Sequence, residues 1–561
     1  MFLVNFSSAP RIWHYALLAA IAGIALLAGN ADLPLIDRDE PRFAQATREM
    51  IQRHEWLIPY FNGEYRFDKP VLSYWLMGAA YFLLGGENEF GARFPSAVTA
   101  LCVAWIIYEI GRRRLNVTIG LSAAAAWLVC LQVLIHGRMA VADMPLILAT
   151  TLANWAIWEL LHKEYFDRRW FAILYFALAF GFLTKGPIAF ICPLTTLLLF
   201  RWVFWRKNMN WQNLRLTWGL PFSLLLIGLW GVPALIESEG LFWHQGMGKH
   251  VLERGIKPFN DRAYTPFFYL RSLPLSLFPA IAFVGGVAAA VRCHWDAWQA
   301  YLLAWFIGPC LIFTFYSTQL SHYVLPAFPA AFLLLAEGAA LPPGLSRWRG
   351  PLFYLICTLA LGTAGVLGGI ALLVDFAPEM SPLRPVVGSV ALILFGLTAL
   401  AWLAKQRWWC ATIVAVIMVG LGLQQAGAGL RLLSPAVRLE GLMQSMPAQT
   451  RYWYSGYEEP SLVFYSNRRW ERLPAEAAVS EILSAQGPCF IVLLREEIRL
   501  NDYLSRALPI LHPTRIKPPS AFQKALLSQL EDPNSAYRAI KVAGVNPARL
   551  SWVRVDAWYK P

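Results

Sequence analysis

Fourteen apolar runs along the first 430 residues constrain this 561-residue chain more than any other feature. A helix that crosses a bilayer needs about 20 predominantly apolar residues, and most of the runs approach that length. Only 15% of the residues are charged, against roughly 25% in soluble domains. We therefore expect a polytopic α-helical membrane protein, and we exclude soluble, disordered and fibrous classes. The runs cover residues 11–30, 71–84, 93–110, 117–136, 142–161, 170–184, 186–203, 215–235, 273–291, 297–316, 323–341, 352–374, 386–404 and 409–429.

The positions of Arg and Lys favour thirteen of these runs as membrane spans. If all fourteen crossed, Arg112–Arg114 and the basic segment 162–169 would lie outside, against the tendency of such residues to stay in the cytoplasm. The run 71–84 is short and rich in aromatic residues, as helices at the interface are, so we assign it to the outer membrane surface. Thirteen spans place the N-terminus in the cytoplasm and the C-terminal region outside. The net charge of +13 then mainly reflects cytoplasmic loops, and we expect no nucleic-acid partner.

The character of the chain changes near residue 430. Residues 1–430 contain the spans and two long outward loops, 31–92 and 236–272, where we expect the active site. Residues 431–561 are polar enough to be soluble and predict a small α/β domain on the outward side. Strands are expected at 451–455, 462–465 and 490–494. A helix that Pro opens is expected at 474–485.

Ionisable residues gather where the first outward loop leaves the first span. Asp37, Arg38, Asp39, Glu40 and Arg42 lie within six residues, and ionisable groups at membrane depth are functional candidates. The amphipathic stretch that follows predicts a helix lying on the membrane surface. From these residues alone, a substrate site and a solvated helix cap both remain open.

Cations near the end of the same loop indicate phosphate binding. Arg66 and Lys69 flank Asp68, just before Pro70, which opens the predicted surface helix. Arg offers bidentate contacts to phosphate and Lys a compact charge. The alternative is that these side chains only extend to lipid headgroups.

Asp143 is the most informative single residue, because it begins an apolar span at its outward end. A carboxylate so near hydrocarbon costs about 2.5–3.5 kcal/mol on insertion scales unless it is compensated. We expect Arg138 or a catalytic task to compensate it, and a helix cap is the alternative. Lys185 occupies a tight turn between two spans and is predicted to face an anionic headgroup.

The second long loop contains His250 and Arg254 among several basic residues, which favours phosphate binding. His250 with Asp68 is a candidate pair for a divalent metal, although two ligands are a weak signal. Tyr323 precedes a later span, where aromatic residues of the interface are common. The sequence lacks Walker A, GxGxxG and GxSxG motifs, so we expect a phosphate-bearing lipid rather than a nucleotide.

Four ordered blocks resemble one known family. The blocks are Asp39-Glu40-Pro41-Arg42-Phe43-Ala44, Phe67-Asp68-Lys69-Pro70, Ala142-Asp143-Met144-Pro145 and Thr184-Lys185-Gly186. In order and spacing they are similar to the bacterial aminoarabinose (4-amino-4-deoxy-L-arabinose) lipid A transferases, GT-C glycosyltransferases related to protein O-mannosyltransferases. The resemblance implies transfer of this sugar from undecaprenyl phosphate to a lipid A phosphate on the periplasmic face of the inner membrane. It also implies resistance to polymyxin and other cationic peptides.

The resemblance gives roles to single residues. Asp39 and Asp143 match two functional carboxylates, Lys69 matches a donor-phosphate lysine and Tyr323 a donor-site tyrosine. His250, with the acidic Asp68, matches a pair that holds a metal, although we expect no required cofactor. Supporting roles are expected for Glu40, Arg42, Arg138 and Arg254. The sequence departs from the family at Phe43, where Tyr is common, at Asp68, where Glu is usual, and at Arg66, where an aromatic is frequent.

We expect a monomeric enzyme, surrounded by membrane lipids, that displaces the lipid phosphate with inversion at the sugar carbon. Lys69, Arg66 and Lys185 would stabilise the departing phosphate, and a carboxylate the oxocarbenium-like carbon. One alternative is a GT-C transferase that moves another polyprenyl-phosphate-linked sugar, such as galacturonic acid or mannose, to lipopolysaccharide core or protein. A second is a flippase of lipid-linked sugars, which predicts charges at the bilayer midplane, whereas the charges here lie at the outward ends.

Overall fold

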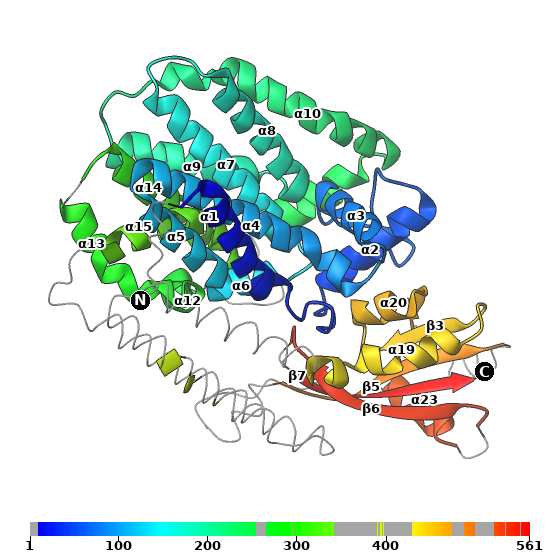
Figure 1. The fold of residues 1–561 in the computed structure, drawn as a ribbon. Helices are drawn as coiled ribbons and strands as arrows, with labels where there is room; N and C mark the ends of the chain where they lie inside the picture. Colours follow the sequence, from blue (N-terminus) through cyan, green and yellow to red (C-terminus); the bar gives the residue numbers. More distant parts are fainter. Residues whose placement is uncertain are drawn as a thin grey trace.

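The computed structural model consists of a helical bundle with a sheet domain beside one end of it (Figure 1). It describes residues 9–253, 265–293, 295–340, 429–473, 487–499, 521–532, 535–549 and 551–560, and a few positions between 390 and 397. The expected spans 352–374, 386–404 and 409–429 lie almost entirely outside the described residues. The count of thirteen spans therefore stays a prediction.

Most apolar runs in the described ranges form helices of the bundle. Five helical stretches are long and apolar enough to cross a membrane: Glu89–Arg114, Asp143–His162, Trp211–Glu237, Ala297–Thr314 and Ser321–Ala340. The bundle elements are α1 (Arg11–Ala22), η2 (Gly23–Leu27), α4 (Glu89–Arg114), α5 (Val117–Val129), α6 (Leu131–His136), α7 (Asp143–His162), α8 (Arg168–Lys185), α9 (Ile188–Leu199), η3 (Phe200–Phe204), η4 (Trp211–Leu214), α10 (Leu216–Glu237), α12 (Phe268–Ser276), η7 (Ala280–Phe283), α13 (Val284–Cys293), α14 (Ala297–Thr314), η8 (Ser321–Ala327) and α15 (Phe328–Ala340).

Two expected spans are wrong as single helices. The run 117–136 breaks at Cys130, whose ψ of 135° leaves the helical region. The run 273–291 breaks after Ser276, where Pro279 lacks the N–H that a continuous helix needs. The two breaks meet, because the Leu131 N–H donates to the Phe278 carbonyl at 3.0 Å. A backbone N–H left free at one break is therefore satisfied by a carbonyl left free at the other.

The basic residues of several loops share one end of the bundle. Arg114, at the end of α4, pairs with Glu159 near the end of α7 at 3.2 Å. Asn213 in the next basic loop donates to the Lys163 carbonyl at 2.9 Å. The ends of α4 and α7 that carry these residues therefore lie together, as the alternation of spans predicts. Which side of the membrane they face stays a prediction.

The first outward loop folds into α2 (Glu40–Arg53), strands β1 (Tyr60–Phe61) and β2 (Glu64–Tyr65), and α3 (Leu72–Leu84), while η5 (Phe242–Glu253) begins the second. The expected helix over 42–53 is confirmed as α2, and its position on the membrane surface stays a prediction. Arg48 of α2 donates to the Phe464 carbonyl at 2.8 Å, and Asn62 accepts from the Trp470 N–H at 2.8 Å. The C-terminal domain thus covers α2. The Phe464 carbonyl and the Trp470 N–H are backbone groups that need hydrogen-bond partners, and Arg48 and Asn62 provide them.

The C-terminal domain contains a mixed five-stranded sheet in the order β4-β3-β5-β7-β6. β3 runs parallel to β4 and β5, whereas β7 runs antiparallel to β5 and β6. Its elements are α19 (Pro435–Ser445), β3 (Arg451–Ser455), α20 (Pro460–Ser466), β4 (Trp470–Arg472), β5 (Cys489–Arg499), α23 (Ala521–Leu530), β6 (Arg538–Asn546) and β7 (Ser551–Lys560).

The strands expected at 451–455 and 490–494 are confirmed, but the strand expected at 462–465 is wrong. These residues belong to α20, which Pro460 opens and which is buried along its whole length. A helix buried on all sides and a buried strand both appear as a short apolar run, so the pattern alone does not separate them. The expected helix 474–485 lies outside the described residues. The boundary of the domain near residue 430 stays a prediction.

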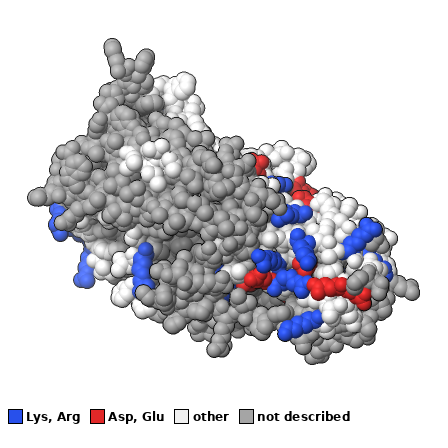
Figure 2. Space-filling model, turned by 90° about the horizontal axis from the view of Figure 1, so that it is seen from below, with Lys and Arg blue, Asp and Glu red and all other residues white. Residues whose placement is uncertain are grey.

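Charges of both signs intermingle on the face of this domain seen in Figure 2. Several of its arginines are neutralised by ion pairs. Arg549 contacts Glu459 at 2.7 Å and Arg554 contacts Glu496 at 2.9 Å, while Arg495 pairs with Glu531 and Asp556. The described part of the domain therefore lacks the single-sign field that would by itself attract an anionic surface.

Candidate active site

Asp143 and Lys185 form an ion pair that joins the start of α7 to the end of α8. The Lys185 Nζ lies 2.5 Å from the Asp143 Oδ1, and both side chains are largely buried. The chain reverses just after Lys185, at Gly186, where φ is +80° and the absence of a Cβ permits that conformation. Asp143 is compensated by a neighbour 42 positions away in sequence, and the expectation that Lys185 faces an anionic headgroup stays a prediction.

Arg138 is not the partner of Asp143. Its guanidinium donates to the carbonyls of Ala25 and Ala28 at 3.1 and 2.6 Å. These carbonyls belong to the end of the first span, where no further helical turn supplies donors. Arg138 therefore closes that helix end, and its expected supporting role is structural. Asp143 is itself the first residue of α7 and does not cap it.

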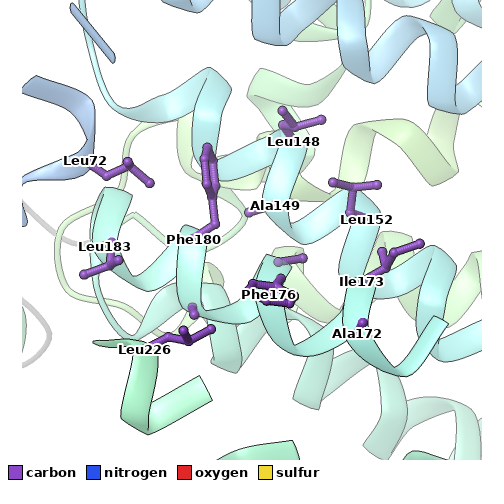
Figure 3. Close-up of a pocket in the computed structure, with 12 residues that line it drawn as sticks. Leu72, Leu148, Ala149, Leu152, Ala172, Ile173, Phe176, Phe180, Leu183 and Leu226 are labelled. Carbon is purple, nitrogen blue, oxygen red and sulfur yellow. The ribbon is translucent and has the colours of Figure 1, made fainter. Parts of the chain in front are cut away.

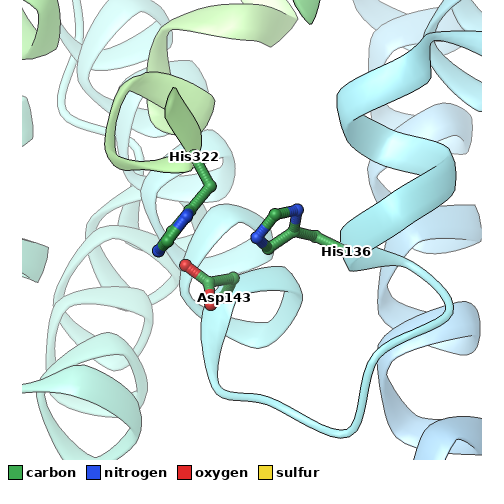
Figure 4. Close-up of side chains that lie close together, drawn as sticks. All are labelled: His136, Asp143 and His322. Atoms are coloured by element: carbon green, nitrogen blue, oxygen red, sulfur yellow. The ribbon is translucent and has the colours of Figure 1, made fainter. Parts of the chain in front are cut away.

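Aromatic and imidazole rings surround the ion pair. The Lys185 Nζ lies 5.7 Å from the centroid of the Tyr323 ring, as expected for a cation–π contact. His322 contacts Tyr323, with ring centroids 4.9 Å apart. His136 lies on the other side of His322, at 4.6 Å between centroids, and Figure 4 shows both imidazoles directed toward Asp143. The structure thus brings the predicted Asp143, Lys185 and Tyr323 together.

A second charged group lies in the first outward loop. Arg66 forms a 3.0 Å ion pair with Asp68 and donates to the Tyr74 hydroxyl at 2.9 Å. Its guanidinium also lies over the Phe43 ring, 5.3 Å from the centroid. Burial by itself would lower the pKa of Arg66, but Tyr74 and Asp68 outweigh it and raise that pKa. Arg66 is therefore a firmly held cation whose charge Asp68 already balances.

Arg42 is different, because no described residue forms an ion pair or a hydrogen bond with its side chain. Burial and the neighbouring Arg66 lower the pKa of Arg42, while Asp39 and Asp68 act in the opposite direction. A partly buried guanidinium with a like charge beside it is suited to an anionic ligand such as phosphate. Asp39 is exposed next to it, and its side chain makes no capping bond to α2.

Glu40 forms the most completely bonded ion pair in the described residues, with Arg93 of α4. The Arg93 Nε and Nη2 each donate to one Glu40 oxygen at 2.8 Å, and the pair is fully buried. Glu40 also accepts from the backbone N–H groups of Ile36 and Ala140 at 2.8 and 2.7 Å. Sequence reasoning missed Arg93, although an arginine at the edge of an apolar span is itself a signal. Glu40 supports the site structurally, since its acceptor sites are occupied.

The two charged groups adjoin. Lys69, which follows Asp68, acts electrostatically on His322 beside Asp143. The metal pair expected from the sequence is not formed by the described side chains, because Asp68 is paired with Arg66 and the His250 side chain lies outside them. Arg254 lies outside the described residues as well. The described His, Cys, Asp and Glu side chains give one group with metal-ligand spacing, formed by His136, Asp143 and His322.

The described helices also enclose an apolar cavity of about 550 Å³. It lies between α3, α7, α8 and α10, and Figure 3 shows leucine and phenylalanine side chains pointing into it. Leu183, only two residues before Lys185, is part of its wall. Such an apolar space suits a hydrocarbon chain. Its lining includes Leu72, Leu148, Leu152, Phe176, Phe180 and Leu226.

Comparisons with known proteins agree with this geometry. Residues 68–227 match the family model of dolichyl-phosphate-mannose-protein mannosyltransferases. The chain is 30% identical to an undecaprenyl phosphate-α-4-amino-4-deoxy-L-arabinose arabinosyl transferase of Sodalis glossinidius, over 59% of this chain and 62% of that protein. It is 27% identical to the enzyme of the same name from an Enterobacter species, over 68% and 71%. With the first of these relatives the match spans less than two thirds of its length.

The fold extends this likeness to nearly the whole chain. A crystal structure of ArnT from Cupriavidus metallidurans bound to undecaprenyl phosphate superposes with a TM-score of 0.73 at 17% identity, covering 98% of both chains. This likeness shows the GT-C glycosyltransferase fold, in a chain with helices long and apolar enough to cross a membrane. Its named relatives are the aminoarabinose transferases, so the resemblance predicted from the four sequence blocks is confirmed.

Proposed function

We propose that this protein transfers 4-amino-4-deoxy-L-arabinose from undecaprenyl phosphate to a phosphate of lipid A. The transfer takes place on the periplasmic side of the bacterial inner membrane, with the C-terminal domain on that same side. The observation that carries the proposal is the combination of three features: the Asp143–Lys185 pair, the cation Arg42, which has no partner among the described residues, and the apolar cavity between α3, α7, α8 and α10. The relatives' printed names supply the donor.

The donor has two parts that these features match. Its phosphate suits Arg42 and Lys69, which are cationic and lie on the loop that adjoins the site. Its polyprenyl chain suits the apolar cavity between α3, α7, α8 and α10, where burial of hydrocarbon is favourable. Arg66 holds Asp68 and Tyr74 in place rather than offering its charge to the ligand.

Transfer breaks the bond between the sugar carbon and the donor phosphate oxygen, and forms a bond from that carbon to an acceptor phosphate oxygen. The departing phosphate carries the negative charge that Arg42 and Lys69 stabilise. The sugar carbon becomes positive in the transition state, and the exposed Asp39 carboxylate or Asp143 stabilises it or holds the sugar's amine. The acceptor phosphate is already ionised near neutral pH, so no strong base is required. Direct displacement inverts the configuration.

Mass spectrometry of lipid A tests the proposal. Lipid A is compared from cells that lack the gene, from cells that express it, and from cells that express Asp143→Asn at matched protein level. We expect a mass increment equal to one aminoarabinose in the second sample alone, together with increased survival in polymyxin. Unchanged lipid A in cells that synthesise the donor would refute the proposal.

A transferase for an acidic sugar is the second candidate, since an unpaired guanidinium also suits a carboxylate. The ion pair of Arg66 with Asp68 counts against it, because the additional cation that an acidic sugar would favour is already balanced. The same spectra separate the two, since a uronic acid and an aminopentose give different mass increments. The flippase alternative predicts no covalent change in lipid A.

A further inference from the structure

Two histidines and one aspartate converge from three separate elements of the bundle. His136 ends α6, Asp143 begins α7 and His322 lies in η8, and one ligand atom from each lies within 4.8 Å of the other two. His136 and Asp143 are buried and His322 is half-buried. Figure 4 shows the two imidazoles and the carboxylate pointing toward one common space.

His136 is oriented as a metal ligand would be. Its Nδ1 lies 3.3 Å from the Gln132 backbone carbonyl, to which it donates in the tautomer that leaves Nε2 for a metal, and 3.0 Å from the Gln132 side-chain nitrogen. A backbone carbonyl that holds one imidazole nitrogen fixes the ring and leaves the other nitrogen for a metal. The Gln132 side chain is in turn held by the Ser276 hydroxyl at 3.2 Å. The ring is therefore fixed by neighbours that the transfer reaction does not use.

His322 lacks such a partner. Its ring contacts His136 and Tyr323, and neither of its nitrogens is hydrogen-bonded to any residue in the described part of the chain. Asp143 gives Oδ1 to Lys185, which leaves Oδ2 for another partner. Two imidazole nitrogens and one carboxylate oxygen thus face each other, and each can still donate a lone pair to a ligand.

We propose that His136, Asp143 and His322 bind a divalent transition-metal ion of the zinc class. Imidazole nitrogen suits such ions, whereas magnesium and calcium prefer sites made of oxygen ligands. Three protein ligands leave a coordination position open to water or to a ligand oxygen. This set differs from the pair of Asp68 and His250 that the sequence resemblance implies. It concerns metal binding and stands whether or not the proposed sugar transfer is correct.

Lys185 makes the inference sharper. Its ammonium occupies one oxygen of the same carboxylate, so a metal ion and Lys185 repel each other across Asp143. Removal of the lysine charge should therefore strengthen metal binding. A purely structural cluster, in which the histidines only orient Asp143, predicts no such gain.

The test is titration of the purified full-length protein, without a polyhistidine tag, with Co²⁺ as a spectroscopic probe and with Zn²⁺ in competition. We expect one ion per chain, with visible Co²⁺ absorption that reports nitrogen ligands. His136→Ala and His322→Ala should each weaken binding by about 100-fold or more, because each removes a direct ligand of the ion. Lys185→Met should tighten binding several-fold. His54→Asn, at an exposed position with φ of 57°, is the matched control and should bind like the unaltered protein.

Size-exclusion profiles identify any variant that fails to fold, and for such a variant His136→Gln or His322→Gln replaces Ala. Binding that His136 and His322 variants leave unchanged would overturn the proposal, as would the absence of a Co²⁺ spectrum in the unaltered protein. Loss of binding in Asp68→Asn alone would assign the metal to the pair implied by the sequence. Lipid A transfer is measured separately, so failure of the metal site and failure of the proposed function remain distinct.

Discussion

Two of the buried ion pairs in the described part of the chain are built very differently. The Arg93–Glu40 pair is bidentate and fully buried, and the Glu40 carboxylate accepts two further backbone bonds. The Lys185–Asp143 pair rests on one contact of 2.5 Å, beside two imidazoles and an aromatic ring. A saturated carboxylate has nothing left to offer a ligand, whereas a carboxylate with one partner does. The proposed roles of the two pairs, structural for Arg93–Glu40 and functional for Lys185–Asp143, thus follow the number of lone pairs that each carboxylate has left.

The same contrast holds for the arginines of the outward loop. Arg66 is balanced by Asp68, and Arg48 of α2 contacts Glu87 at 3.0 Å. Arg42 has no such partner among the described residues. Residues of one type within one loop therefore separate into structural and binding roles by the partners they have, which sequence blocks alone do not reveal.

Loss of the Arg93–Glu40 pair should have the largest effect, and that effect should be on folding. Arg93→Met leaves the Glu40 carboxylate buried without its cation, which costs about 3–5 kcal/mol. We expect little monodisperse protein in detergent and a markedly lower melting temperature by intrinsic fluorescence. The double variant Arg93→Met with Glu40→Met removes both charges and should recover part of the loss. Normal stability of the single variant would contradict the structural role.

Asp143→Asn should act on transfer instead. The amide keeps the shape of the side chain but lacks the charge that stabilises the transition state, so we expect at least about a 100-fold loss. Asp39→Asn should behave likewise. Lipid A modification by purified protein in vesicles measures both. Asp32→Asn, at an exposed position in the same loop, is the control. Full activity of either variant, or a loss in Asp32→Asn, would contradict the assignment.

Arg42→Met should weaken donor binding by about 10- to 100-fold, because charged hydrogen bonds contribute about 1.5–3 kcal/mol. Arg42→Lys should recover only part of the affinity, since Lys does not bind phosphate in a bidentate manner. Competition with undecaprenyl phosphate in a transfer assay measures the change. Arg53→Met on the exposed side of α2 should leave binding unchanged, and equal losses in both variants would show a general effect of charge.

The smallest expected effect is a pH dependence at Asp37. Burial and the charge of Glu459 raise the pKa of Asp37 to about 7, above the value of about 3.9 in an unfolded chain. The folded state therefore holds the proton more tightly, so the stabilisation is present below pH 4 and is lost as pH rises through 7. Asp37→Asn should flatten this dependence, and still accept the Ser461 N–H that Asp37 binds at 3.0 Å.

Melting temperatures at pH 5 and pH 8 check this prediction. The difference between the two temperatures should be smaller in Asp37→Asn than in the unaltered protein, by an amount on the order of 2 °C. Asp32→Asn should keep the pH dependence of the unaltered protein, because its side chain is exposed. An equal pH dependence in Asp37→Asn and in the unaltered protein would show that another group is responsible.

Hydropathy and motifs predicted the broad organisation from sequence alone. Apolar runs marked the bundle helices because their length is set by the bilayer, and four short blocks marked residues of the candidate site. Breaks such as the one at Cys130 were not predicted, since its neighbours are held by residues 276–278, more than 140 positions away. Such a contact leaves no local signal.

Partners were the least predictable feature. Nearness in sequence favours Arg138 as the partner of Asp143, whereas Lys185 lies 42 residues further on and contacts Asp143 through the antiparallel packing of α7 and α8. His136 was missed because a single histidine at the end of an apolar run is usually a packing residue. His136 becomes a candidate metal ligand only together with His322, which the fold places beside it from a distant part of the sequence.

Glu40 also fixes a distance. It adjoins Asp39 in the chain, and one of its oxygens binds the backbone N–H of Ala140, three residues before Asp143. The two carboxylates proposed to handle the sugar are thus attached to opposite sides of one buried side chain, which acts as a spacer between them. Glu40→Asp, one methylene shorter, would draw the two closer together, so the separation of the reacting groups is set by a residue that touches neither sugar nor phosphate.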